Sequence, residues 1–130
     1  MPVKSIIKRK KKQIKDVKTA RVYVNSTFNN TIISITDDEG NALSWSSAGH
    51  LGFKGARKAT PYAAQQATEN ALEKAKAYNI ENFRLFIRGI GPGRESAIRL
   101  FQTKKLRVIG IKDITPIPHN GCRPKKPRKV

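Results

Sequence analysis

Three closely spaced glycines, Gly89, Gly91 and Gly93, form the segment of this sequence whose residue types best suit chemistry. Glycine lets a loop turn tightly and leaves backbone N–H groups unobstructed, and a helix beginning near Arg94 would direct its positive dipole end to the same place. These features suit a phosphate group. A dinucleotide fingerprint would need Gly at position 94, and no Lys followed by Ser or Thr completes a phosphate-cradling loop. A tight turn, or a contact with RNA or protein, is therefore favoured over a nucleotide site.

Residues for metal-dependent or nucleophilic catalysis are present but poorly arranged. Two-metal hydrolysis needs carboxylates that converge from strands, whereas the acidic residues 37–39 lie in a predicted turn. Cys122, the only cysteine, lies near His119 in a proline-rich segment that would not hold a base in a fixed orientation. We predict no catalytic residue, no metal site and no cofactor. A phosphate-handling enzyme that uses the 89–93 loop is the alternative from another functional class.

Positive charge is the strongest signal in the sequence. The 130 residues include 27 Lys and Arg against 9 Asp and Glu, for a formal net charge of +18. We predict a basic N-terminal arm (1–18), a single domain (19–115) and a basic, proline-rich C-terminal tail (116–130), with both ends flexible until they bind a polyanion. No apolar run resembles a signal peptide or a membrane span, so we expect no membrane partner and a reducing compartment.

Residue periodicity predicts an α/β domain. Apolar and polar residues alternate in three segments separated by turns before residue 48, then from Phe83, and again near Val108. Thr60-Pro61 predicts the start of a helix whose alanine stripe lies close to a sheet, and Asn79 is a plausible C-cap. Parallel strands need crossover connections. We therefore expect a mixed five-stranded sheet, an antiparallel meander followed by strand-helix-strand units, with packed helices and a ribonuclease H-like architecture.

Basic and small polar residues in the predicted loops favour contact with folded RNA. Lysine and arginine among glycines can reach phosphates and 2′-hydroxyls, and a polar hairpin tip around Asn29 and Asn30 could enter a shallow groove. Stacking on single-stranded bases is less favoured, because most aromatic residues occupy apparent core positions. A DNA-compacting protein is a further alternative, although no helix carries the basic face of a major-groove reader.

Four motifs resemble, in the same order, the bacterial-type family of small-subunit ribosomal protein eleven. They lie in residues 27–31, 52–65, 91–97 and 113–124. The sequence departs mildly from the family at Ile90, where Pro is frequent, and in the lysine-rich first residues. The similarity covers nearly the whole chain from Val17.

This resemblance implies a non-enzymatic protein of the small ribosomal subunit, cytoplasmic in a bacterium or encoded by an organelle. It would bind platform rRNA near the messenger exit region, with messenger RNA nearby and neighbouring platform proteins such as proteins seven, eighteen and twenty-one. The charge pattern and the motifs together predict these rRNA contacts: Lys8, Arg9, Lys10, Lys11, Lys12, Asn29, Asn30, Thr31, Lys54, Arg57, Lys58, Arg88, Arg94, Arg99, His119, Asn120, Arg123, Lys125, Lys126, Arg128 and Lys129.

Asn120 is also a candidate for chemical modification. Because Gly121 has no Cβ, its backbone nitrogen can attack the Asn120 side chain and form a succinimide that opens to isoaspartate. We predict partial isoaspartate at this position, with ordinary deamidation damage as the alternative.

Overall fold

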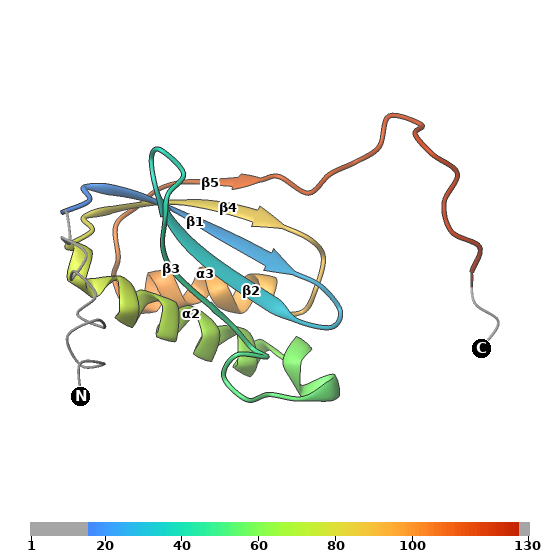
Figure 1. Ribbon diagram of the computed structural model, residues 1–130, viewed down its shortest axis with the longest axis horizontal. Helices are drawn as coiled ribbons and strands as arrows, with labels where there is room; N and C mark the ends of the chain where they lie inside the picture. The colour runs from blue at the N-terminus through green and yellow to red at the C-terminus, as the bar shows by residue number, and fades with distance from the viewer. Residues whose placement is uncertain (1–15, 128–130) are drawn as a thin grey trace, which may run out of the picture.

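Two helices cover one face of a five-stranded sheet in the computed structural model, which describes residues 16–127 (Figure 1). The strands are β1 (Thr19–Ser26), β2 (Thr31–Asp37), β3 (Ala42–Ser47), β4 (Asn82–Arg88) and β5 (Val108–Asp113). The helices are α2 (Pro61–Ala75) and α3 (Arg94–Thr103), with short 3-10 turns η1 (Gly55–Ala59) and η2 (Lys76–Tyr78). The predicted contacts that lie outside the described residues are Lys8, Arg9, Lys10, Lys11, Lys12, Arg128 and Lys129.

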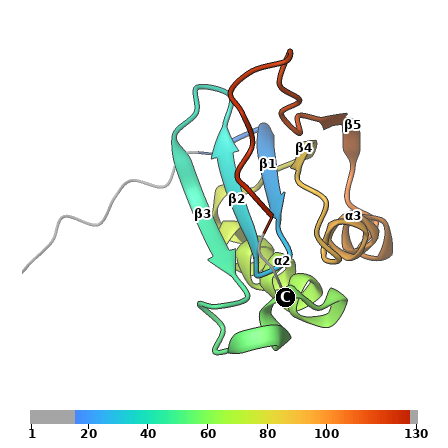
Figure 2. The ribbon, with the colours of Figure 1, turned by 90° about the vertical axis from the view of Figure 1, so that its right-hand side faces the viewer.

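The strands lie in the order β3-β2-β1-β4-β5, which Figure 2 shows from β3 on the left to β5 on the right. β2 is antiparallel to both of its neighbours, whereas β4 is parallel to both β1 and β5. The predicted mixed sheet with parallel later strands is therefore confirmed. As a consequence of these directions, β1, β3, β4 and β5 all end at the edge of the sheet where β2 begins.

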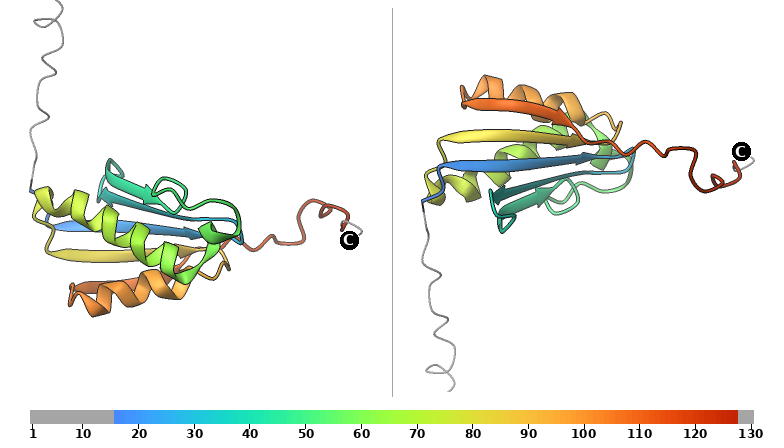
Figure 3. Two further views of the ribbon diagram at one scale, coloured as in Figure 1. Left: turned by 90° about the horizontal axis from the view of Figure 1, so that it is seen from below. Right: turned by 90° about the horizontal axis from the view of Figure 1, so that it is seen from above.

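The hydrophobic core lies between the sheet and the helices (Figure 3). Five alanines of α2 are at most 2% exposed, and their small size lets the helix approach the sheet closely; they are Ala63, Ala64, Ala67, Ala71 and Ala75. The α2 start agrees with its sequence signals, because Thr60 Oγ1 accepts a hydrogen bond from Ala63 N at 3.2 Å and Pro61 occupies the first turn. Asn79 adopts the left-handed conformation expected of a C-cap, with φ of 50°. No helix in residues 16–127 is long and apolar enough to cross a membrane.

The positions of the aromatic residues differ from the prediction. Only Phe83 and Phe101 are buried, while Phe28, Trp45 and Tyr62 are all more than half exposed. In β3, the small residues face α2 instead: Ser44 Oγ donates to Ala71 O at 2.9 Å, and Asn70 Nδ2 on α2 donates to Ser46 Oγ at 3.2 Å. A helix that packs this closely through alanines leaves no room for an indole at that position, so Trp45 lies on the outside.

Candidate nucleic-acid interface

The strand directions bring several groups of predicted contact residues to one edge of the sheet, which we call the loop end. It comprises the β1–β2 turn (27–30), the loop between β3 and α2 (48–60), the β4–α3 loop (89–93) and the first residues after β5 (114–115) (Figures 1 and 3). These segments are far apart in the sequence. The sheet topology therefore gathers residues that the sequence alone could only assign to separate loops.

The β1–β2 turn presents a rigid tip. Thr27 Oγ1 accepts hydrogen bonds from Asn29 N and Asn30 N at 3.2 and 3.0 Å, and Thr27 N donates to Asn30 O at 2.8 Å. The Asn30 side chain is itself part of the turn, because its Oδ1 accepts from Thr31 N at 2.9 Å. The side chains presented to a partner are therefore those of Asn29 and of Phe28, which is 70% exposed.

Thr31, predicted to contact RNA, is buried inside the protein. It is 0% exposed beneath the turn, and its Oγ1 has no hydrogen-bond partner among the described residues. A fully buried side chain cannot reach a phosphate while the hairpin is folded. The structure therefore does not support a direct RNA contact by Thr31.

The loop between β3 and α2 carries exposed cations next to this turn. Lys54 and Arg57 are exposed, and Lys58 is half-buried. A Cβ placed on Gly49 would lie 3.6 Å from Lys58 Cδ and 3.8 Å from Asn30 Nδ2, which shows that the lysine stem and the turn amide converge on this glycine. The loop and the turn thus form one continuous surface.

The β4–α3 loop forms a close-packed turn and not a phosphate cradle, which agrees with the sequence analysis, where a nucleotide site was disfavoured. A Cβ on Gly89 would lie 2.0 Å from Ser26 O and one on Gly91 would lie 2.2 Å from Thr27 O, so both residues must be glycine for the loop to pack against the β1–β2 turn. Two of the loop's backbone N–H groups are also occupied: Gly91 N donates to Ser26 O at 3.2 Å and Gly89 N donates to Thr115 Oγ1 at 3.1 Å. The tight turn was one of the two interpretations that the sequence favoured over a nucleotide site.

Arg94 joins this loop to the end of β5. Its Nη1 donates to Gly89 O at 3.0 Å, and its Nη2 lies 2.6 Å from Asp113 Oδ2. Arg99 lies further along α3, where its guanidinium is 3.7 Å from Glu95 Oε2. Arg94 therefore holds the loop end together before it meets any partner, and Arg99 lies outside the cluster that the structure assembles.

The lowered pKa of Asp113 is expected to make the stability of the folded protein depend on pH in the acid range. The Thr115 hydroxyl and backbone N–H, followed by Arg94, lower the pKa of Asp113 from 3.8 to about 2. Because the folded-state pKa is the lower one, this stabilisation is fully present above about pH 4 and is lost as the pH falls towards 2. We expect Asp113→Asn to be less stable than the wild type at pH 6 in urea unfolding, and the difference to shrink at pH 2. A difference that stays constant from pH 6 to pH 2 would contradict this assignment.

The remaining predicted contacts flank the loop end. Arg88 is exposed on the uncovered face of the sheet, beside Asn25 and Ile32. The chain from residue 116 to 127 contains no helix or strand and leads away from the sheet (Figure 1). It exposes the side chains of His119, Asn120, Arg123, Lys125 and Lys126.

The carboxylates are distributed differently from these cations. Asp16 and the acidic residues 37–39 lie together at the opposite end of the sheet, where Glu81 also precedes β4. Near the loop end, Asp113 and Glu95 are each within 4 Å of an arginine. Positive charge therefore dominates the loop end. No group of three or more His, Cys, Asp or Glu in residues 16–127 is placed to hold a metal ion.

Exposed aromatic residues are the feature of this surface that the sequence reasoning missed. Phe28 lies at the tip of the β1–β2 turn, and Phe53 and Tyr62 contact each other edge-on beside the cationic loop, with ring centroids 6.0 Å apart. A usable signal was present in the sequence. Phe28 and Phe53 are each flanked by turn-forming residues, and a phenylalanine in such a position does not belong to a strand or helix that buries it.

Comparison with known proteins identifies the family. A family model described as ribosomal protein S11 matches residues 20–129. Two relatives, each named small ribosomal subunit protein uS11, come from two strains of Treponema pallidum, one of which is the Nichols strain. Each is 54% identical over 124 residues, which cover 95% of this chain and 98% of the relative. The chain belongs to the ribosomal protein S11 family.

Proposed function

We propose that this protein is a non-enzymatic, structural constituent of the small ribosomal subunit that binds platform rRNA near the messenger exit region and so supports translation. The observation that carries the proposal is the loop end, where the cations of the 48–60 loop lie beside the polar β1–β2 turn, while Asp16 and the acidic residues 37–39 lie at the opposite end of the sheet. Membership of the S11 family supports it. Neighbouring platform proteins, such as proteins seven, eighteen and twenty-one, and nearby messenger RNA complete the proposed surroundings in a bacterial or organellar ribosome.

The proposed mechanism is neutralisation of phosphates from a fixed platform. Closely packed RNA strands repel one another through their phosphates, and lysine or arginine side chains between them remove that repulsion. The described residues proposed to do this are Asn29, Lys54, Arg57, Lys58, Arg88, His119, Asn120, Arg123, Lys125 and Lys126. Asn30 and Arg94 contribute by shaping the surface, since their polar atoms already bond within the protein.

We also propose a ribonuclease H-like architecture used for binding alone, flanked by the basic arm (1–18) and tail (116–130), which order on RNA. The strand order β3-β2-β1-β4-β5 with β2 antiparallel supports the architecture. At the end of the arm, Val17 N donates to Tyr78 O at 2.9 Å, which fixes where the arm leaves the domain.

Binding to a platform fragment of small-subunit rRNA tests the proposed function. The complex should survive at about 150 mM salt in the presence of excess unrelated structured RNA, because shape recognition adds to the salt-sensitive attraction. Duplex DNA should compete no better than unrelated RNA. A complex that unrelated RNA or duplex DNA dissolves, both for the protein alone and with neighbouring platform proteins added, would reduce the protein to a general polyanion binder and overturn the proposal.

We propose in addition that Asn120 is partly isoaspartate in assembled particles. Asn120 is exposed with φ of 55°, and Gly121 follows it. Attack by the Gly121 nitrogen releases ammonia and gives a succinimide, which water opens to isoaspartate. Peptide mass spectrometry with enzymatic methylation of isoaspartate should detect it, and Gly121→Ala should suppress it. An Asn120 that stays unmodified in particles and converts only in aged, purified protein would identify ordinary damage.

A further inference from the structure

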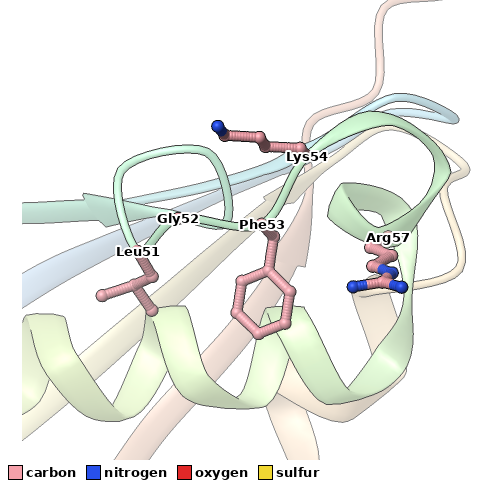
Figure 4. A pocket seen from close by; sticks show the side chains of 5 residues that line it. All are labelled: Leu51, Gly52, Phe53, Lys54 and Arg57. Carbon is pink, nitrogen blue, oxygen red and sulfur yellow. The ribbon is translucent and has the colours of Figure 1, made fainter.

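A preformed hollow lies within the loop between β3 and α2. It has a volume of about 400 Å³ and is lined by Leu51, Gly52, Phe53, Lys54 and Arg57. Figure 4 shows Leu51 and Phe53 projecting to the same side of the loop, with the Arg57 guanidinium beside the phenyl ring and Lys54 pointing the other way. The hollow thus combines an apolar wall with cations at two of its borders.

The loop that forms the hollow is held by its own backbone. Leu51 N donates to Ser47 O and Phe53 N donates to Ala48 O, each at 3.2 Å. The phenyl ring of Phe53 makes an edge contact with the ring of Tyr62 on the first turn of α2. Both apolar side chains remain only half-buried although the surrounding backbone is ordered. The protein therefore presents a rigid aromatic surface that its own core does not cover.

The chemistry of this hollow fits one nucleotide. Every nucleobase has a flat face that stacks on an aromatic ring regardless of its identity, and its attached phosphates are anionic. The two charged side chains that line the hollow, Lys54 and Arg57, are both cationic, so the phosphates attached to a bound base meet attraction at its borders. An apolar side chain from a protein would fill the same volume but would leave both cations without a partner.

We propose that this hollow accepts a single unpaired base of the bound RNA, stacked on Phe53, while Arg57 and Lys54 contact the phosphates on either side of it. This inference rests on the proposed function and adds to it a specific subsite. It changes the recognition from phosphate neutralisation alone to selection of a nucleotide that is free to leave its helix. Paired nucleotides cannot enter, because their bases are already stacked and hydrogen-bonded.

A double-mutant cycle between Phe53 and the RNA tests the subsite. Unpaired nucleotides of the platform fragment are made abasic one at a time, which removes the base and keeps the phosphate. For the wild-type protein, one position should weaken binding about fivefold to a hundredfold, the range of a base stacked on an aromatic ring. Phe53→Ala should weaken binding to intact RNA by a similar factor. At that one position the two losses should not multiply, because each removes the same contact.

Phe28→Ala is the matched control, because Phe28 is an exposed phenylalanine at the loop end but outside the hollow. Its effect should multiply with the abasic effect at the selected position. Thermal unfolding verifies that each variant is folded, and Phe53→Leu, which keeps apolar volume without the ring, replaces Phe53→Ala if the alanine variant unfolds. Losses that multiply for Phe53 at every position would overturn the subsite while leaving RNA binding intact. A wild-type protein that does not bind the intact fragment, alone or with neighbouring platform proteins added, would instead refute the proposed function.

Discussion

Replacing Gly89 by alanine is expected to lower the free energy of unfolding by about 2–5 kcal/mol, or to prevent folding. Two costs add at this position. Gly89 has φ of 97°, a conformation that costs an L-residue about 1–2 kcal/mol. A Cβ there would also lie 2.0 Å from the backbone oxygen of Ser26, and relieving such an overlap costs about 1–3 kcal/mol. Because the obstructing atom is backbone, no side-chain rotation can remove the overlap.

Two other glycines separate these costs. Gly40 has φ of 93° but no atom within 4 Å of an added Cβ, so Gly40→Ala should show the conformational cost alone. Gly110 lies in β5 with neither feature, and Gly110→Ala should be nearly neutral. Thermal or urea unfolding of the three variants should give the order Gly110, Gly40, Gly89 from the smallest to the largest loss. An unfolding midpoint for Gly89→Ala equal to that of Gly110→Ala would show that the β4–α3 loop does not pack on the β1–β2 turn as described.

The β4–α3 loop shows which features could be predicted from the sequence and which could not. The spacing of the glycines correctly indicated a tight turn between a strand and a helix, because those preferences are local. The reason for the glycines is not local: the atoms that exclude a Cβ belong to Ser26 and Thr27, more than sixty positions earlier in the chain. The sequence does not show that β1 pairs in parallel with β4. For that reason the N–H groups of these glycines looked free to bind a phosphate.

A similar contrast applies to the rest of the surface. The start of α2 and its alanine stripe follow from adjacent residues, so Thr60, Pro61 and the stripe were identified correctly. Cationic loops were also recognised, since charge is read directly from composition. Their convergence at one edge depends on strand directions, and the pairing of Arg94 with Asp113 depends on β5 lying beside β4. The outward position of Trp45 depends on how closely α2 approaches β3.

Removing two cations from the loop end is expected to change the salt dependence of RNA binding. The double variant Arg57→Ala, Lys58→Ala should reduce the slope of log binding constant against log salt concentration by about 1.8. This value is that of two lost phosphate contacts at about 0.9 each, the value for duplex B-DNA, which we apply to duplex RNA. Across the range from about 50 to 200 mM salt, the affinity of the wild type should therefore fall about tenfold more than that of the variant. Arg57 is exposed, and Lys58 contributes mainly its stem to packing near Gly49, so the domain should remain folded.

The matched control removes the same charge from the other end of the sheet. Lys76 and Arg107 are both exposed at this end, where Lys76 follows α2 and Arg107 immediately precedes β5. The double variant Lys76→Ala, Arg107→Ala has the same net charge as the loop-end variant, so any effect of total charge is equal in the two proteins. Titrations against the platform fragment at several salt concentrations should leave the control slope close to that of the wild type. Equal slopes for the two variants would mean that net charge alone drives binding, and the loop end would lose its assigned role as the contact surface.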